Sequence, residues 1–197
     1  YVGPDTEIIA SVKANAYGHG LRPVARTALA AGADRLAVHR IQAAIALREA
    51  HISAPILLLG HTPLSGIDLV LYHSITPTLV DWQTAKYLSE RTDKDIYVHI
   101  KIDTGMSRYG LELDKAVDFI HYVADLPHLM IEGLFSHFAT ADASDLSFAR
   151  QQWQQFRLLL DTLHNDGIKI PVPHLCNSAG LVQMPEAHLA AVRPGLL

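Results

Sequence analysis

A lysine follows an apolar, strand-like run near the start of the chain, in the segment SVKANAYGHG (Ser11–Gly20). A lysine drawn into a partly dry pocket has a lowered pKa, which makes its amine a nucleophile or a Schiff-base former. The alternative is a lysine at a strand end whose ammonium group stays in solvent. Lys13 is therefore a candidate catalytic residue whose surroundings decide its role.

Two segments near the end of the chain combine small residues with polar side chains. HLCNSAG contains Asn177 and Ser178, and RPGLL follows Val192 with Arg193, Gly195 and Leu196. The Ser178 hydroxyl and the backbone N–H groups of Gly195 and Leu196 can converge on a phosphate, as loops after the last two strands of a barrel often do. An ordinary asparagine cap and a Pro-Gly turn would use the same residue types.

A third polar segment, KIDTGMSRYG, places Lys101, Asp103 and Arg108 at the end of a strand and in the loop after it. The planar guanidinium of Arg108 suits bidentate capture of a carboxylate or phenolate. The three residues would also be compatible with a solvated, self-paired cluster. His137 lies between aromatic residues in FSHFAT, where it either stacks on a flat ligand or bonds the backbone as a core histidine.

Several classes of function lack support in the sequence. None of the 12 histidines belongs to an H-E-x-x-H pattern or lies beside cysteine and carboxylates at ligand spacing, so we expect no metal site. The G-x-S-x-G, P-loop and G-x-G-x-x-G patterns are absent, which argues against serine hydrolysis and nucleotide binding. A net charge of -4 without a basic tract argues against nucleic acid as a partner.

Length and composition are those of one globular domain: the chain has 197 residues, 49% of them hydrophobic and 18% charged. Apolar runs such as PILLLG are far shorter than the ~20 residues that cross a bilayer, so we expect no membrane partner. The lone Cys176 leaves no disulfide within the chain and makes a cytoplasmic location the default. The chain starts at Tyr1 rather than Met, so a removed targeting segment stays open.

Short apolar runs alternate with stretches of helical periodicity along the chain. This alternation indicates βαβ units and a parallel sheet, and eight strands favour an α/β fold of the TIM-type (β/α)8 barrel class, with the chain truncated at the end of the eighth strand. We expect strands at residues 7–14, 35–39, 55–60, 74–80, 95–103, 128–138, 172–177 and 189–195. We expect the main helices at residues 22–33, 41–50, 82–91, 113–126 and 147–164.

In such a barrel the carboxyl ends of the strands and the loops after them form the active face. The polar residues that fall at or just beyond these ends are Lys13, Lys101, Asp103, Arg108, His137, Asn177, Ser178 and Arg193. This common position predicts that they share one site.

Five segments, VKANAYGHG, KIDTGMSRYGL, EGLFSHFATAD, HLCNSAG and VRPG, resemble in order and spacing the barrel domain of the alanine racemases, which are fold-type III pyridoxal-phosphate enzymes. The resemblance runs from Ile8 to Leu197. It implies that residues 1–197 form a barrel domain that binds pyridoxal 5'-phosphate, and that the family's C-terminal β domain is absent. The implied activity is an isomerase that interconverts L- and D-alanine and supplies D-alanine for peptidoglycan.

The resemblance also implies cofactor contacts, residue by residue. Lys13 matches the lysine that forms a Schiff base with the cofactor and serves as one of two catalytic bases. Tyr17 matches the tyrosine that reaches the cofactor phosphate, where Ser178 and the backbone of Gly195 and Leu196 join it.

The remaining matches surround the cofactor ring. His137 matches the histidine near the pyridine ring, and Asn177 lies beside the phosphate-binding serine. Arg193 matches the arginine that contacts the ring nitrogen; because it cannot accept that nitrogen's proton, it restrains carbanion stabilisation and limits side reactions. Arg108 matches the arginine that contacts the phenolic oxygen and helps hold the substrate carboxylate. Lys101 matches a lysine that is carbamylated in some family members and positions that arginine.

Racemisation requires two bases on opposite faces of Cα. In the family the second base is a tyrosine from the C-terminal β domain of the neighbouring subunit of a homodimer. We therefore expect the 197-residue chain, as a fragment, to bind the cofactor weakly and to racemise alanine poorly or not at all.

The chain departs from the family pattern in two loops. Ala43 stands where an acidic residue is expected, and His39 and Arg40 stand where smaller or apolar residues are usual. Ser107 and Tyr109 replace the more typical Gly and Leu. These changes leave room for a serine or broad-specificity racemase. Two other hypotheses are a non-catalytic pyridoxal-phosphate carrier and a phosphate-binding barrel enzyme whose lysine forms a Schiff base with a sugar.

Overall fold

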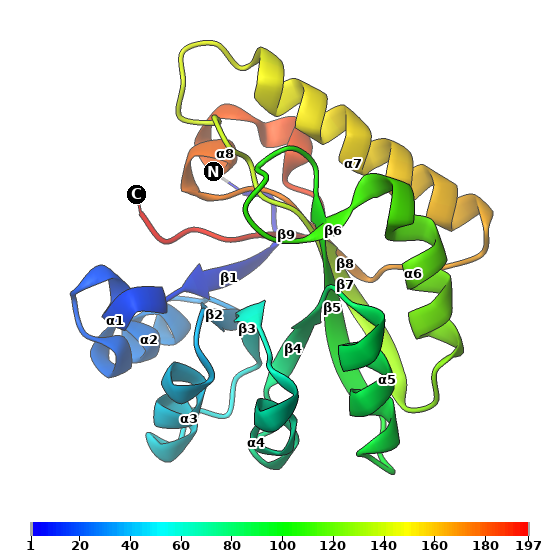
Figure 1. Ribbon diagram of the computed structural model, residues 1–197. Coiled ribbons are helices and arrows are strands. Elements are labelled where there is room, and N and C mark those ends of the chain that lie inside the picture. The colour runs from blue at the N-terminus through cyan, green and yellow to red at the C-terminus, as the bar shows by residue number, and fades with distance from the viewer. Residues whose placement is uncertain (1, 197) are drawn as a thin grey trace.

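Eight parallel strands form a closed ring in the computed structural model, which describes residues 2–196 (Figure 1). Neighbours along the chain pair with one another, and β9 closes the ring by pairing with β1. The prediction of a TIM-type barrel is therefore confirmed. The strands of the ring are β1 (Glu7–Ser11), β2 (Arg35–Val38), β3 (Ile56–His61), β4 (Thr76–Leu79), β5 (Ile96–Asp103), β7 (Leu129–Phe135), β8 (Val172–His174) and β9 (Ala191–Val192).

Helices follow the strands and lie around the outside of the ring (Figure 1). Asp81 caps α5 by accepting a hydrogen bond from the Thr84 amide at 2.7 Å, which satisfies one of the free N–H groups of the first turn. Within residues 2–196, no helix is both long and apolar enough to cross a membrane. The helices are α1 (Lys13–Tyr17), α2 (Leu21–Ala30), α3 (Ile41–Glu49), α4 (Ile67–Tyr72), α5 (Trp82–Glu90), α6 (Leu113–Asp125), α7 (Ser147–Asn165) and α8 (Ser178–Gln183).

The two faces of each strand have different environments, because successive side chains of a strand point to opposite sides. In β5, Val98, Ile100 and Ile102 are fully buried in the apolar layer shared with the helices. The alternate positions His99 and Lys101 face the inside of the barrel, where they are also buried. A small apolar layer fills part of the same interior; it consists of Ile9, Ala37, Leu57, Val172 and Ala191. The barrel interior therefore contains polar as well as apolar side chains.

Some local details differ from the expectations. The first strand was expected to run to Ala14 but ends at Ser11, and the chain enters a left-handed turn directly after Lys13. An extra two-residue strand, β6 (Leu111–Glu112), pairs with the end of β5 and lies outside the ring. The last strand was expected over residues 189–195 but is confined to Ala191–Val192, because Pro194 has no N–H group to continue the ladder.

Candidate active site

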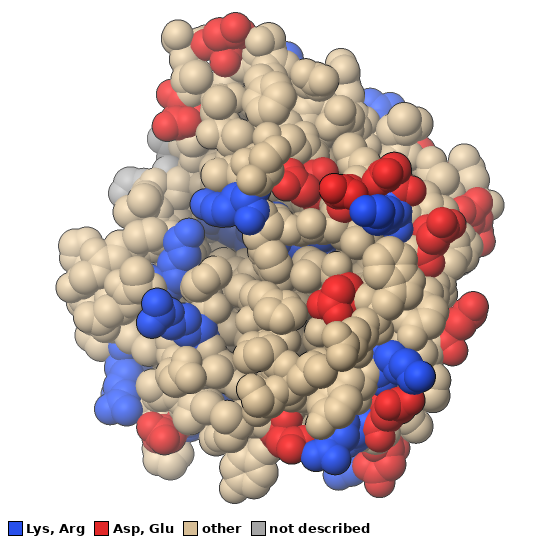
Figure 2. Space-filling view, in the orientation of Figure 1, with Lys and Arg blue, Asp and Glu red and all other residues tan. Residues whose placement is uncertain are grey.

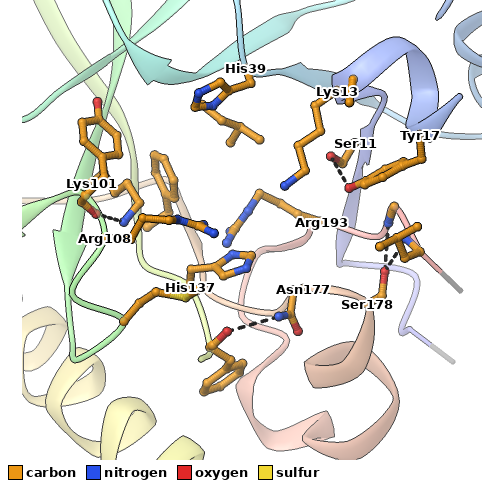
Figure 3. Close-up of a pocket in the computed structure, with 18 of the residues that line it drawn as sticks. Ser11, Lys13, Tyr17, His39, Lys101, Arg108, His137, Asn177, Ser178 and Arg193 are labelled. Atoms are coloured by element: carbon orange, nitrogen blue, oxygen red, sulfur yellow. Dashed lines mark hydrogen bonds between the residues drawn. The ribbon is translucent and has the colours of Figure 1, made fainter. Parts of the chain in front are cut away.

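Lys13 lies at the carboxyl end of β1 and points into a cavity of about 1310 Å³ (Figure 3). Partial burial lowers the pKa of Lys13, and the nearby guanidinium groups of Arg108 and Arg193 lower it further. Its Nζ lies 5.8 Å from the centre of the Tyr17 ring. The strand thus delivers an amine that loses its proton more easily than an ordinary lysine, as a nucleophile or a base requires.

A left-handed turn connects Lys13 to Tyr17. Four consecutive residues have positive φ: 51° for Ala14, 55° for Asn15, 52° for Ala16 and 54° for Tyr17. This conformation is costly for residues with a Cβ atom. The Asn15 side chain offsets part of that cost, because its Oδ1 accepts a hydrogen bond from the Leu21 amide at 2.8 Å. The turn carries Tyr17 back alongside Ser11, so two hydroxyl groups meet at the cavity wall.

Four hydrogen-bonding groups form an anion cradle beside Lys13. The backbone N–H groups of Gly195 and Leu196 each donate to Ser178 Oγ at 2.9 Å. The hydroxyl groups of Tyr17 and Ser11 lie 3.2 Å apart on the facing wall. A Cβ atom at Gly195 would lie 2.4 Å from the Tyr17 hydroxyl, so glycine is required for this close approach. We use the term anion cradle for Tyr17, Ser178, Gly195 and Leu196.

Arg193 lies beneath the cavity and is 5% exposed. Its guanidinium donates to three neutral acceptors: His174 Nδ1, the Ser136 carbonyl at 2.6 Å and the Leu175 carbonyl at 3.2 Å. Burial lowers the pKa of Arg193 to about 10. The group therefore stays protonated at neutral pH, and it can donate to a ligand but cannot accept a proton from one.

His137 and Asn177 also line the cavity, but they differ in how far their side chains are already engaged in hydrogen bonds within the protein. Burial lowers the pKa of His137 to about 3, helped by Arg193, Arg108 and other cations, so its imidazole is neutral. Asn177 caps α8 through a 2.9 Å bond from the Gly180 amide, and its NH₂ group donates to a backbone carbonyl. Its role in the structure is therefore to hold the first turn of α8, which carries Ser178.

Arg108 projects from the loop between β5 and β6 toward Lys13 and Arg193 (Figure 3). Asp103 shapes that loop, because its Oδ1 accepts bonds from the Gly105 and Ser107 amides at 2.8 and 3.0 Å. Lys101 donates from Nζ to the Tyr109 carbonyl of the same loop. Burial lowers the pKa of Lys101 to about 8, although Asp103 opposes the shift. Within residues 2–196, no hydrogen bond or ion pair engages the Arg108 guanidinium, so it can bind an anion.

The cavity is strongly cationic. The lining side chains include one acidic residue in the part of the chain that the structure describes, Asp142. The basic ones are Lys13, Arg40, Lys101, Arg108 and Arg193. In the space-filling view, basic side chains gather beside a hollow on the face shown (Figure 2). A site of this kind favours an anionic ligand, because the negative charge of the ligand offsets the repulsion among the neighbouring positive charges.

The structure brings the candidate residues of the sequence into one cavity, except Asp103, which does not line it and acts on the Arg108 loop instead. It also adds residues that the sequence reasoning did not select as candidates. Ser11 faces Tyr17, and His174 accepts from Arg193. His99 alternates with Lys101 in β5, so strand periodicity was a signal that both side chains point into the barrel. No comparable signal marked Ser11.

The fold and the site together define a class: a parallel barrel with a cationic cavity, in which a lysine of lowered pKa lies beside a group of hydrogen-bond donors. Comparison with known proteins gives the family. The model named "Alanine racemase, N-terminal domain" matches residues 1–197, and the chain belongs to this family.

Individual relatives agree with the family. The chain is 44% identical over 195 residues to the alanine racemase of Clostridium tetani, which covers 97% of the chain and 50% of that protein. It is 40% identical over 198 residues to the alanine racemase of Methanococcus maripaludis, which covers 98% of the chain and 53% of that protein. A solved alanine racemase of Clostridium difficile 630, in complex with cycloserine, matches with a TM-score of 0.96 and 35% identity over 99% of the chain and 55% of that structure. The chain spans about half the length of these relatives.

Proposed function

We propose that the chain is the cofactor-binding barrel of an enzyme that interconverts L- and D-alanine with pyridoxal 5'-phosphate, supplying D-alanine for peptidoglycan. The observation that carries the proposal is the placement of Lys13, with its lowered pKa, in one cavity with the anion cradle. Family membership supports it. So does a solved alanine racemase of Bacillus anthracis with bound L-Ala-P, which matches at 36% identity with a TM-score of 0.92 over 99% of the chain and 51% of that structure.

The residues present fit this cofactor. The anion cradle would hold the phosphate, since two backbone N–H groups and two hydroxyl groups meet where Gly195 leaves room for Tyr17. Lys13 would hold the cofactor covalently. Arg193 would donate to the ring nitrogen, His137 would lie near the ring, and Arg108 would bind the phenolic oxygen.

When bound, the cofactor supplies an electron sink that stabilises negative charge at the substrate Cα. Lys13 Nζ, once free, removes or returns the proton on one face of Cα, and its lowered pKa provides the neutral amine that this step needs. Arg108 binds the substrate carboxylate and orients Cα toward Lys13. Arg193 remains protonated and limits how much negative charge the ring accepts, which favours return of the proton over side reactions.

Lys101 has a supporting role in this proposal. With a pKa of about 8, about a tenth of its amine is neutral at pH 7, and this neutral form can add to carbon dioxide, releasing a proton and forming a carbamate. The resulting negative charge would face the Arg108 loop and hold that guanidinium in place. Loss of the carbamate would leave the present contact from Lys101 to the Tyr109 carbonyl.

The second proton transfer is assigned by family resemblance to a tyrosine of a C-terminal β domain in a neighbouring subunit, so the working enzyme is proposed to be a homodimer. The 197-residue chain alone is then expected to racemise alanine poorly or not at all. Turnover by this chain close to that of full-length racemases would contradict this part of the proposal.

Reductive trapping tests the cofactor assignment. The chain is incubated with pyridoxal 5'-phosphate, reduced with borohydride, digested, and the modified peptide located by mass spectrometry. We expect the label on Lys13, and its loss in K13A. K115A is the matched control, because Lys115 is an exposed lysine paired with Glu112 outside the cavity. Labelling spread over surface lysines, unchanged in K13A, would overturn the proposal.

A second candidate, preference for serine over alanine, is favoured by one observation. His39 lines the cavity at the end of β2, where Figure 3 shows it on the side of Lys13 away from Tyr17. Burial and the cations Lys13, Arg108 and Arg40 lower the pKa of His39, so it is neutral at pH 7. A neutral imidazole there can accept a hydrogen bond from a substrate hydroxyl. Assays of both amino acids with the polypeptide extended through the second base separate the two substrates, and absence of turnover with either would favour a carrier.

A further inference from the structure

A chain of hydrogen bonds leads from the site into the barrel interior. Arg193 contacts His174 Nδ1, and His174 Nε2 lies 2.8 Å from His99 Nδ1. His99 Nε2 lies 3.1 Å from Glu132 Oε2. Glu132 in turn pairs with Arg35 at 2.7 Å. We call Arg193, His174, His99 and Glu132 the interior relay.

Two local features of β7 place Glu132 in this chain. The register between β5 and β7 shifts between Val98 and His99, which pair with Ile131 and Gly133, so Glu132 is an extra residue in β7. Such a bulge redirects a side chain, and Glu132 reaches the interior, where it is 15% exposed. A Cβ atom at Gly133 would lie 2.3 Å from the His99 ring, so glycine leaves the space that the imidazole occupies.

The proton positions along the interior relay follow from its first member. A guanidinium can only donate, so His174 Nδ1 accepts from Arg193. Burial lowers the pKa of both His174 and His99, so both rings are neutral and each carries one proton. The proton of His174 is therefore on Nε2 and is donated to His99 Nδ1. The proton of His99 is then also on Nε2 and is donated to Glu132, whose pKa is held at about 2 by His99 and Arg35 despite its burial.

All the bonds of the relay consequently point the same way, from the buried cation to the buried carboxylate. Each imidazole presents its lone pair to the positive end and its N–H to the negative end, which polarises the next bond favourably. The three groups that accept hydrogen bonds directly from Arg193 are neutral. Through the relay, the negative charge of Glu132 is connected to the positive charge of Arg193 by hydrogen bonds.

We propose that Glu132 is a positioning residue: by accepting from His99 at the acceptor end of the relay, it stabilises the tautomer order in which His174 Nδ1 can accept from Arg193, and so holds the Arg193 guanidinium in the orientation that a ligand in the cavity meets. The part that concerns the cofactor ring rests on the proposed function. The tautomer order does not, because it is a property of the chain without any ligand.

The first test measures the tautomers directly. Two-bond 1H–15N correlation spectra of the 197-residue chain, recorded at pH 7 without cofactor, report which ring nitrogen carries the proton. We expect His99 and His174 both protonated on Nε2. A proton on Nδ1 of either ring, or a doubly protonated ring, would overturn the proposal.

The second test uses paired variants. E132A removes the acceptor of His99, whereas E7A removes the other carboxylate of Arg35, which pairs with it at 2.6 Å and lies outside the relay. E132Q keeps an oxygen that can accept from His99. We expect mixed tautomers in E132A, and wild-type tautomers in E7A and E132Q. If E132A does not fold, mixed tautomers in H99F at His174 provide the same comparison.

Cofactor affinity then links the relay to the site. The Kd for pyridoxal 5'-phosphate, followed by its absorbance, is expected to rise about tenfold in E132A and to stay within about twofold in E7A and E132Q. Equal effects of E132A and E7A would assign Glu132 a general structural role and overturn the proposal. If the wild-type chain fails to bind the cofactor, the proposed function fails instead, while the tautomer spectra still decide the order of the relay.

Discussion

His137 lies among four cationic side chains, and this arrangement determines how it responds to pH. Arg193, Arg108, Lys13 and Lys101 all disfavour a further positive charge, and burial is the largest cause of its lowered pKa. The folded chain therefore keeps a neutral imidazole where the unfolded chain would carry a proton in mild acid. The same four cations favour the binding of an anionic ligand.

The cost of this neutral histidine is measurable. The pKa of His137 falls from 6.5 to about 3, so as pH drops through this interval the unfolded state binds a proton that the folded state does not, and stability decreases. Between pH 7 and pH 4.5 we expect wild type to lose about 2 kcal/mol more free energy of unfolding than H137Q. Urea titrations at both pH values measure this difference. H121Q is the control, since His121 is half-exposed and paired with Asp166; equal losses in wild type and H137Q would contradict the prediction.

His39 provides a prediction about substrate choice. If its imidazole accepts from a substrate hydroxyl, H39A should lower the ratio of kcat/KM for serine to that for alanine by about three- to tenfold, the worth of one neutral hydrogen bond. The measurement uses the polypeptide extended through the second base. H61A is the control, because His61 also lines the cavity but faces Asp81 at 4.0 Å. An unchanged ratio in H39A would exclude this role.

At the scale of elements, the left-handed turn after Lys13 places strain next to the reactive amine. Positive φ at four successive non-glycine residues costs free energy that the rest of the fold must supply. The turn is anchored at both sides, by the Ala16 amide bonding to the Val12 carbonyl at 2.9 Å and by the Asn15 side chain bonding to α2. The turn places Tyr17 beside the other members of the anion cradle. The strained residues therefore lie next to the groups that would bind a ligand.

Glycine substitutions should reveal this strain through the sign of the change in the free energy of unfolding. A14G removes the Cβ penalty at φ 51° and is expected to stabilise the chain by about 1 kcal/mol. A28G makes the same change inside the right-handed helix α2 and is expected to destabilise it by about 1 kcal/mol. Chemical denaturation of both variants gives the comparison. Destabilisation of similar size in both would show that the turn is unstrained in solution.

The elements also show which features a sequence reveals. The apolar runs around Leu57 and Ile100 predicted strands correctly, because burial on both faces leaves a continuous hydrophobic signal. Lys13 and Ser178 could be assigned to one site because strand ends share a face of the barrel. The left-handed turn and the bulge at Glu132 could not be predicted, since neither has a local pattern and both depend on contacts with distant strands.

At the scale of the whole molecule, the shortest strand closes the ring. β9 has two residues, yet it joins β1 to β8 and is followed by the residues of the anion cradle. The Ser11 amide, for example, donates to the Pro194 carbonyl at 2.8 Å. By contrast, β5 and β7 pair continuously from Ile96 and Leu129 to Lys101 and Phe135 apart from the bulge. Stability should therefore be unequal around the ring.

Native-state hydrogen exchange measures this inequality. We expect the Glu7 and Ser11 amides, which bond to the Ala190 and Pro194 carbonyls, to exchange through openings of lower free energy than amides between β5 and β7. If pyridoxal 5'-phosphate is the ligand, as proposed, it should raise the protection of Ser11, because a ligand that binds only the closed form stabilises that form. Uniform protection around the ring, or no change at Ser11 on cofactor binding, would contradict this expectation.

The position of β9 in the chain has a consequence during protein synthesis. Lys13 and Tyr17 leave the ribosome before Arg193, Gly195 and Leu196, which follow every strand that the structure describes. A growing polypeptide therefore exposes the Lys13 amine long before the backbone N–H groups of Gly195 and Leu196 complete the anion cradle. Retention of the proposed cofactor would therefore require translation past Leu196, and its capture would be a chemical signal that every strand of the ring has been synthesised.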